Sequence, residues 1–99
     1  MTVYVDNLQM KVKLFGWWGV WSNLYADTTE ELIDFADDVV GLSPHSMFDR
    51  EYINERYVIN EKKRMMALEK GAIAIRHGGP IMVGIIRDKK EKGYKEKGL

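Results

Sequence analysis

Three acidic side chains stand where the chain could hold a metal ion. Asp6 follows a β-branched segment, and Asp27 and Glu31 lie at the start of an acidic run. Carboxylate oxygens bind Mg²⁺, and a metal held in this way could support phosphoryl transfer. The same residues also suit a helix start, with Asp27 or Thr28 as the N-cap and Glu31 completing a capping box. We expect capping and keep the metal site of Asp6, Asp27 and Glu31 as the alternative.

A second candidate site combines aromatic rings with basic side chains. The run GWWGVW holds more indole than a 99-residue domain readily buries. An exposed indole can stack on a nucleotide base, and basic residues at a helix N-terminus suit a phosphate. Two alternatives remain for the rings, namely packing in the core or burial in a protein interface. The alternative for the basic residues is a face exposed to solvent. The expected ligand-binding residues are Trp17, Trp18, Trp21, Asn23, Tyr57, Lys63 and Arg64.

Other chemistries find little support in the sequence. His45 and His77 fall in predicted loops beside Pro or Gly, without a partner at metal-ligand spacing, and we expect exposed loop histidines. The chain has no cysteine, which excludes disulfides, thiolate zinc sites and thiol catalysis. No phosphate-binding glycine loop or hydrolase motif occurs. We therefore expect no catalytic residues and no cofactor.

The charge is balanced overall but unevenly distributed. Residues 1–55 carry three basic and ten acidic side chains, whereas residues 56–99 carry twelve basic and five acidic ones. The asymmetry fits a charged partner, or acidic and basic elements that pack together within the chain or across a dimer. The N-terminus has no signal-peptide pattern, and no apolar run approaches the ~20 residues that span a bilayer. We expect a cytoplasmic protein with no membrane partner.

The hydrophobic pattern predicts an α+β domain. Strands are expected at 2–6, 9–15 and 20–26, a helix at 28–40, a short helix within 42–60, and a helix at 61–70. The apolar segments 72–75 and 80–86 indicate two further strands around a hairpin loop at 76–79. The order β-β-β-α-α-β-β gives a small mixed β-sheet with two or three helices packed on one face. The domain should span 1–87, followed by a basic flexible tail at 88–99.

Helix ends and inward faces follow from the same pattern. Gly41 and Gly71 are expected to end the two main helices, and Asn60 to cap the second one. The first helix should turn Leu32, Phe35, Ala36 and Val39 inward, and the second Met65, Leu68 and Ala72. Asp37 and Asp38 near the end of the first helix oppose its macrodipole, so a basic group is expected nearby.

Two segments, MTVYVDN at 1–7 and ADTTEEL at 26–32, resemble a family of small bacterial and phage proteins, the domain of unknown function numbered four thousand and thirty-one. The resemblance covers roughly residues 1–76. It includes a later pattern formed by Lys63, Arg64, Ala67, Gly71 and Ala72. The matching polar positions are Asp6, Asp27, Glu31, Tyr57 and Arg64.

The chain departs from this family where the family has histidines. Asn23 and Ile33 stand at two such positions, and Arg56, Tyr57 and Val58 replace a His-Tyr-Asp triplet. The resemblance implies that any chemistry or metal binding by those family residues is lost here. This favours a binding protein over an enzyme.

We therefore expect a non-catalytic, homo-oligomeric binding protein for an anionic nucleotide-type ligand. The resemblance suggests a phage-encoded protein that acts on a host signal. One alternative is a metal-dependent phosphoryl-transfer enzyme using Asp6, Asp27 and Glu31. Another is a protein-interaction inhibitor that presents the acidic helix 28–40 to a protein partner. Nucleic acid is not an expected partner.

Overall fold

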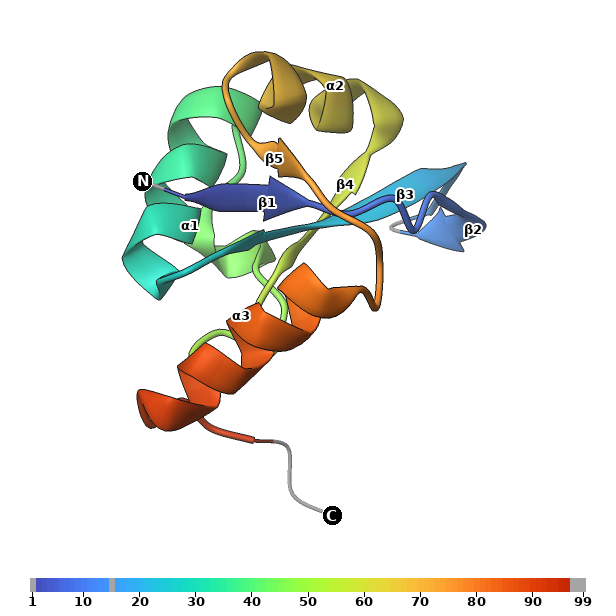
Figure 1. Cartoon of the computed structure of the whole chain (residues 1–99). Coiled ribbons are helices and arrows are strands. Elements are labelled where there is room, and N and C mark those ends of the chain that lie inside the picture. Colours follow the sequence, from blue (N-terminus) through green and yellow to red (C-terminus); the bar gives the residue numbers. More distant parts are fainter. Residues whose placement is uncertain (1, 15, 97–99) are drawn as a thin grey trace.

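A computed structural model describes residues 2–14 and 16–96 (Figure 1). Five strands form one mixed sheet with three α-helices around it, which confirms the predicted α+β class. Helices α1 and α2 cover one face of the sheet, and α3 crosses the other (Figure 1). The elements are β1 (Val3–Val5), β2 (Met10–Leu14), β3 (Trp17–Ala26), α1 (Thr29–Phe35), β4 (Tyr57–Asn60), α2 (Glu61–Glu69), β5 (Ile73–Ala74) and α3 (Pro80–Glu91).

Strands β1 and β2 lie end to end along one edge of β3. Trp21 of β3 lies between Met10 of β2 and Asn60 of β4. Leu24 of β3 lies between Val5 of β1 and Tyr57 of β4. Because β4 occupies one edge of β3, both β1 and β2 must occupy the other. Between them, the four residues 6–9 lie opposite only two residues of β3, so the strand is locally interrupted.

The two faces of the sheet carry separate apolar clusters. Side chains alternate between the faces along β3, so Leu24 and Ala26 point toward α1 and α2, whereas Tyr25 points toward α3. The larger cluster comprises Val3, Val5, Leu24, Ala26, Leu32, Phe35, Ala36, Val40, Tyr57, Ile59, Ala67 and Ala72. The smaller one comprises Tyr25, Ile75 and Ile85, with Tyr4 and Met82 packed against it.

The first helix begins and ends as predicted. Thr28 is the N-cap, and its hydroxyl oxygen accepts a hydrogen bond from the Glu31 N–H at 3.2 Å. A π-helical turn, Ala36–Val40, extends α1, and Gly41 ends it with φ of 69°. The basic group expected near this acidic end is Lys63, whose Nζ donates to the Val40 carbonyl at 2.7 Å. This contact places a cation at the negative end of the helix.

The segment between α1 and α2 differs from its prediction. A short 3₁₀ helix, Pro44–Ser46, and strand β4 replace the expected short helix. Tyr57 and Ile59 are buried and the residues between and after them are half-buried, which is the alternation of a strand. Pairing with β3 decided the conformation of this segment.

The prediction of a strand at 80–86 was wrong, because these residues begin α3. Gly79 is the N-cap, and Pro80 lies in the first turn of the helix. Backbone N–H groups in the first turn have no partner within the helix, so proline, which has no N–H, is tolerated there. Met82, Ile85 and Lys89 follow at helical spacing and face the sheet, whereas Ile81 and Val83 are exposed. The apolar residues on both sides of this segment therefore do not indicate a doubly buried strand.

Residues 88–96 are not the flexible tail that we expected. Residues 88–91 complete α3, and Lys89 is buried. The backbone of Lys95 pairs with that of Tyr52 in an isolated parallel β-bridge. Burying a charged lysine requires a partner, and that partner lies in the segment before β4. Residues 97–99, and the predicted strand end at Phe15, lie outside the described residues.

Two smaller differences concern tryptophan and methionine positions. Strand β3 begins at Trp17 rather than at residue 20, so it is longer than the predicted strand at 20–26. Met65, which was predicted to face inward, is 52% exposed, and Ala67 is the buried residue of α2. Leu68 and Ala72 do face the core as predicted.

Candidate functional site

The carboxylate of Asp6 fills the interruption between β1 and β2. It is fully buried. Its Oδ1 accepts the backbone N–H groups of Leu8 at 3.2 Å and Asn23 at 2.9 Å, and its Oδ2 accepts Nδ2 of Asn23 at 2.9 Å. The side chain thus supplies an acceptor where the ladder of backbone hydrogen bonds is broken. Strand irregularities of this kind are over-represented next to active sites.

His77 reaches the same carboxylate from the loop after β5. Its Nδ1 lies 2.9 Å from Oδ2 of Asp6, and its backbone N–H donates to Oδ1 of Asn7 at 2.8 Å. Because β5 runs parallel to β1, the segments that leave both strands emerge at the same end of the sheet. The imidazole is 41% exposed above the buried carboxylate. The predicted exposure of His77 is therefore confirmed, but the sequence did not reveal its partner.

Arg64 of α2 contacts the backbone at the same strand interruption. Its Nε donates to the backbone carbonyl of Asp6 at 3.2 Å, and its guanidinium lies 3.5 Å from Oε1 of Glu61. Glu61 in turn accepts a hydrogen bond from the side chain of Gln9 at 3.3 Å. These contacts give Arg64 a structural role at the expected site, rather than direct exposure to a ligand.

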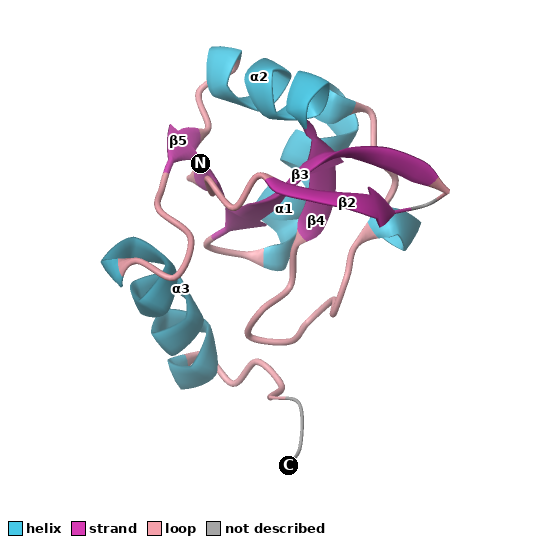
Figure 2. Ribbon diagram, turned by 90° about the vertical axis from the view of Figure 1, so that its right-hand side faces the viewer, coloured by secondary structure: helices cyan, strands magenta, loops and turns pink. Residues whose placement is uncertain are grey.

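An open cavity of about 390 Å³, here called the sheet pocket, adjoins the Asp6–His77 pair. Helix α3 lies toward the β5 side of the sheet and leaves β2 uncovered (Figure 2). The sheet pocket occupies this uncovered part, and apolar side chains dominate its lining. The lining residues are Leu8, Met10, Val12, Leu14, Trp21, Asn23, Tyr25, Asn54, Arg56, Val58, His77 and Met82.

Arg56 brings a guanidinium to the sheet pocket, where it forms an ion pair with Asp49. One guanidinium nitrogen donates to Oδ2 of Asp49 at 2.9 Å and to the Asn54 carbonyl at 3.2 Å. The guanidinium carbon also lies 5.5 Å from the centre of the Phe48 ring. A guanidinium has five N–H donors, so Arg56 keeps donor capacity after these contacts.

Tyr25 lies in the sheet pocket as a neutral phenol. Burial raises the pKa of its hydroxyl well above its ordinary value, and the negative charge of Asp6 raises this pKa further. Arg56 acts in the opposite direction but does not offset burial. The Tyr25 hydroxyl is therefore uncharged at neutral pH.

The structure separates the three tryptophans that we expected to act together. Trp21 lines the sheet pocket, and its indole N–H donates to the Val12 carbonyl at 3.1 Å. Trp17 and Trp18 are 74% and 76% exposed at the far end of the β2–β3 hairpin. Only one of the three rings therefore lies beside Asn23 in the pocket.

Tyr57 and Lys63, two further expected ligand residues, lie away from the sheet pocket. Tyr57 is fully buried in the larger core, so no ligand reaches it in this structure. Its hydroxyl is the one buried side-chain polar atom without a hydrogen-bond partner among the described residues. Lys63 lines a different cavity beside α2, together with Trp21 and Asn60.

The alternative metal site is not assembled. Asp6 follows the C-terminal end of β1, whereas Asp27 and Glu31 lie near its N-terminal end, next to Thr2. Asp27 does not cap α1; it accepts a hydrogen bond from the Tyr4 hydroxyl at 3.1 Å. Among residues 2–14 and 16–96, no group of three or more histidine or acidic side chains is placed to hold a metal ion.

Glu31 satisfies two groups at the start of α1. Its Oε1 accepts the Thr28 hydroxyl at 3.0 Å, and its Oε2 accepts the backbone N–H of Thr2 at 2.7 Å. The capping interaction of Thr28 is therefore confirmed, but the Glu31 carboxylate accepts the backbone N–H of Thr2, just before β1, rather than that of Thr28.

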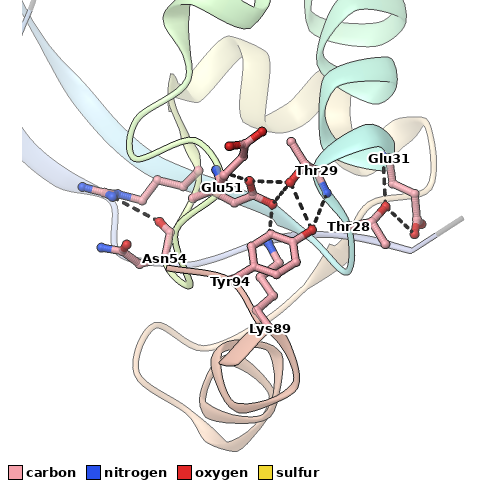
Figure 3. A network of polar contacts seen from close by, with 9 residues as sticks. Thr28, Thr29, Glu31, Glu51, Asn54, Lys89 and Tyr94 are labelled. Carbon is pink, nitrogen blue, oxygen red and sulfur yellow. Dashed lines mark hydrogen bonds and ion pairs between the residues drawn. The ribbon is translucent and has the colours of Figure 1, made fainter. Parts of the chain in front are cut away.

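A buried polar network fixes α3 and the segment after it (Figure 3). Nζ of Lys89 lies 2.9 Å from Oε2 of Glu55, and the two side chains are only 1% and 0% exposed. Glu55 also accepts the Thr29 hydroxyl at 2.7 Å and the Glu51 backbone N–H at 3.0 Å. The Tyr94 hydroxyl accepts the Thr29 N–H at 3.1 Å. Burial lowers the pKa of Lys89, and its bond to Glu55 opposes that change.

Sequence reasoning missed several residues of the sheet pocket. Met10, Val12 and Leu14 alternate along the predicted strand at 9–15 and line the pocket together, but the sequence did not show that α3 would leave this face uncovered. Arg56 and His77 are brought to this face by β4 and by the loop after β5. The local sequence around either residue carried no signal of this arrangement.

These elements define a small α+β protein with a carboxylate–imidazole pair beside an open pocket on its sheet. The chain belongs to the family described as "Protein of unknown function (DUF4031)", whose model matches residues 3–86. This match confirms the family suggested by the sequence and includes both Asp6 and His77. Comparisons with curated proteins and with solved structures found no match. No helix within the described part of the chain is long and apolar enough to span a membrane.

Proposed function

We propose that this chain binds a small anionic nucleotide-type ligand in the sheet pocket. The observation that carries the proposal is the meeting of aromatic rings and basic groups on one open sheet face. Trp21 offers a surface on which a base can stack, and Arg56 offers donors for a phosphate. The side-chain amide of Asn54 is a further polar group for recognising a ligand.

The basic contribution comes from other residues than those expected. Arg64 and Lys63 already donate to the backbone carbonyls of Asp6 and Val40, respectively. Arg56 takes their place in the proposal because it lines the pocket and keeps donors beyond those used by Asp49 and Asn54. Sequestering a nucleotide signal in the cytoplasm of a phage host is the use that we propose for such binding.

Trp21 fluorescence tests this proposal directly. In the double variant Trp17→Phe, Trp18→Phe, Trp21 is the single tryptophan of the chain. We expect AMP to change its emission with saturation, and adenosine, which lacks the phosphate, to bind more weakly. Arg56→Met should weaken AMP binding, whereas Arg87→Met, on the exposed side of α3, should not. Absence of any saturable change with AMP, GMP or their cyclic forms would overturn the proposal.

We also propose self-association through the tip of the β2–β3 hairpin. Two adjacent indoles, Trp17 and Trp18, are about three-quarters exposed, and large exposed aromatic groups frequently mark protein interfaces. The double variant Trp17→Ser, Trp18→Ser should reduce the mass found by sedimentation equilibrium. A wild-type protein that is monomeric at all accessible concentrations would rule out this second proposal.

A further inference from the structure

The Asp6–His77 pair has the geometry that prepares an imidazole to accept a proton. Asp6 already accepts three N–H bonds, from Leu8 and from the backbone and side chain of Asn23. An acceptor-only carboxylate at 2.9 Å requires the hydrogen of the imidazole to be on Nδ1. Nε2 is then the basic nitrogen, and it makes no hydrogen bond within residues 2–14 and 16–96. Histidine general bases are oriented in this way.

The surroundings of this imidazole suit a reaction that develops negative charge. His77 and Arg56 line the same cavity. A guanidinium stabilises charge on phosphoryl oxygens through paired hydrogen bonds. Tyr25 stays protonated, because burial and Asp6 both raise its pKa, so it is a donor rather than a competing base.

We propose that the sheet pocket hydrolyses a cyclic phosphodiester nucleotide, with His77 as the general base. This inference rests on the proposed function and names the substrate class of the same site. Among the residues that the structure describes, the lining of the pocket contains no serine, threonine, cysteine or lysine that could act as a nucleophile. Water is therefore the attacking group. The simplest substrate is a ribonucleoside 2′,3′-cyclic phosphate, whose strained five-membered ring opens readily.

The reaction needs no partner other than water. The oxygen of water forms a bond to phosphorus while the bond from phosphorus to one ribose oxygen breaks. Nε2 of His77 takes the proton from water and returns it to the departing ribose oxygen. The product is a nucleoside monophosphate with a free ribose hydroxyl. Arg56 stabilises the additional negative charge on the phosphoryl oxygens during this step.

Asp6 is a positioning residue in this scheme, because the pocket lining does not include it. Its carboxylate fixes the tautomer of His77 and stabilises the imidazolium that forms. The three N–H bonds to Asp6 hold the carboxylate in place. Asp6→Asn should therefore slow turnover by changing the tautomer and leave nucleotide binding in place.

The test uses the full chain and 2′,3′-cyclic AMP, with the product followed by phosphorus NMR. We expect slow metal-independent conversion to adenosine 2′- or 3′-monophosphate, reduced by about 100-fold or more in His77→Ala. His45→Ala is the matched control, since the chain has only these two histidines, and it should retain full turnover. Added imidazole should restore part of the activity of His77→Ala, which a merely structural role for His77 would not permit.

The outcomes separate the inference from the proposed function. Saturable binding of 2′,3′-cyclic AMP without turnover would overturn the hydrolytic inference and leave the binding proposal standing. Absence of binding would overturn both. Turnover that is unchanged in a folded His77→Ala protein, checked by its amide NMR spectrum, would also overturn the role of His77. Asp6→Asn turnover equal to wild type would overturn the positioning role of Asp6.

Discussion

Lys89 and Glu55 form an ion pair that is almost fully shielded from water, with 2.9 Å between Nζ and Oε2. The pair joins α3 to the segment that leads into β4. Both parts contribute to the sheet pocket, through Met82 of α3 and through Asn54 and Arg56 beside Glu55. The ion pair therefore joins two segments that line the pocket.

Removing one member of this pair should destabilise the fold strongly. In Lys89→Met, the Glu55 carboxylate stays buried without its cation, and the expected cost is about 3–5 kcal/mol in the free energy of unfolding. Lys90→Ala breaks an exposed pair with Glu96 and should cost at most about 1 kcal/mol. Urea denaturation measures both variants. Equal losses in the two variants would contradict the assigned importance of the buried pair.

The unpartnered hydroxyl of Tyr57 should contribute nothing to stability. Tyr57→Phe removes a buried polar atom without a hydrogen-bond partner, so we expect unchanged stability or a gain of up to about 1 kcal/mol. Tyr94→Phe is the matched control, because its hydroxyl accepts the Thr29 N–H, and it should lose about 1 kcal/mol. A larger loss in Tyr57→Phe than in Tyr94→Phe would show that Tyr57 has a partner.

The protein should lose stability at alkaline pH through its tyrosines. Burial and the hydrogen bond to Asp27 raise the pKa of Tyr4 to about 12, and burial raises the pKa of Tyr25 and Tyr57. An unfolded tyrosine ionises near pH 10, so stability is fully present below about pH 10 and is lost as pH rises through the folded pKa values.

Lys89 contributes to the pH dependence with the opposite sign. Its lowered folded pKa makes stability rise with pH until the unfolded lysine deprotonates near pH 10.5. Denaturation between about pH 10.5 and 12 therefore isolates the tyrosines, and Tyr4→Phe should lose stability less steeply there than wild type. Identical slopes for the two proteins would contradict the assignment for Tyr4.

Local patterns predicted the elements whose signals are carried within a few residues. Thr28 and Asn60 cap their helices, and Gly41 ends the first one, because each acts on backbone groups three or four positions away. The α+β class followed from the change between strand and helix periodicity. The strand β4 and the helix α3 were missed, because pairing with β3 and the burial of Lys89 are decided by distant segments.

The candidate site was predictable only in part for the same reason. Asp6, Trp21 and Asn23 were singled out by their sequence, and the structure places all three at or beside the sheet pocket. His77 lies 71 residues from Asp6 along the chain, and their contact depends on the parallel pairing of β5 with β1. A two-residue strand gives little hydrophobic pattern from which that pairing could be read.

The central claim, that the sheet pocket is a nucleotide site, is tested most directly by the indole NMR signals of the three tryptophans. Trp21 lies in the pocket, whereas Trp17 and Trp18 are exposed at the hairpin tip and serve as internal controls. We predict that AMP, added to the full chain, shifts the Trp21 indole signal with saturation and leaves the other two signals unchanged. A saturable shift confined to Trp17 and Trp18, or no shift at all, would contradict the claim.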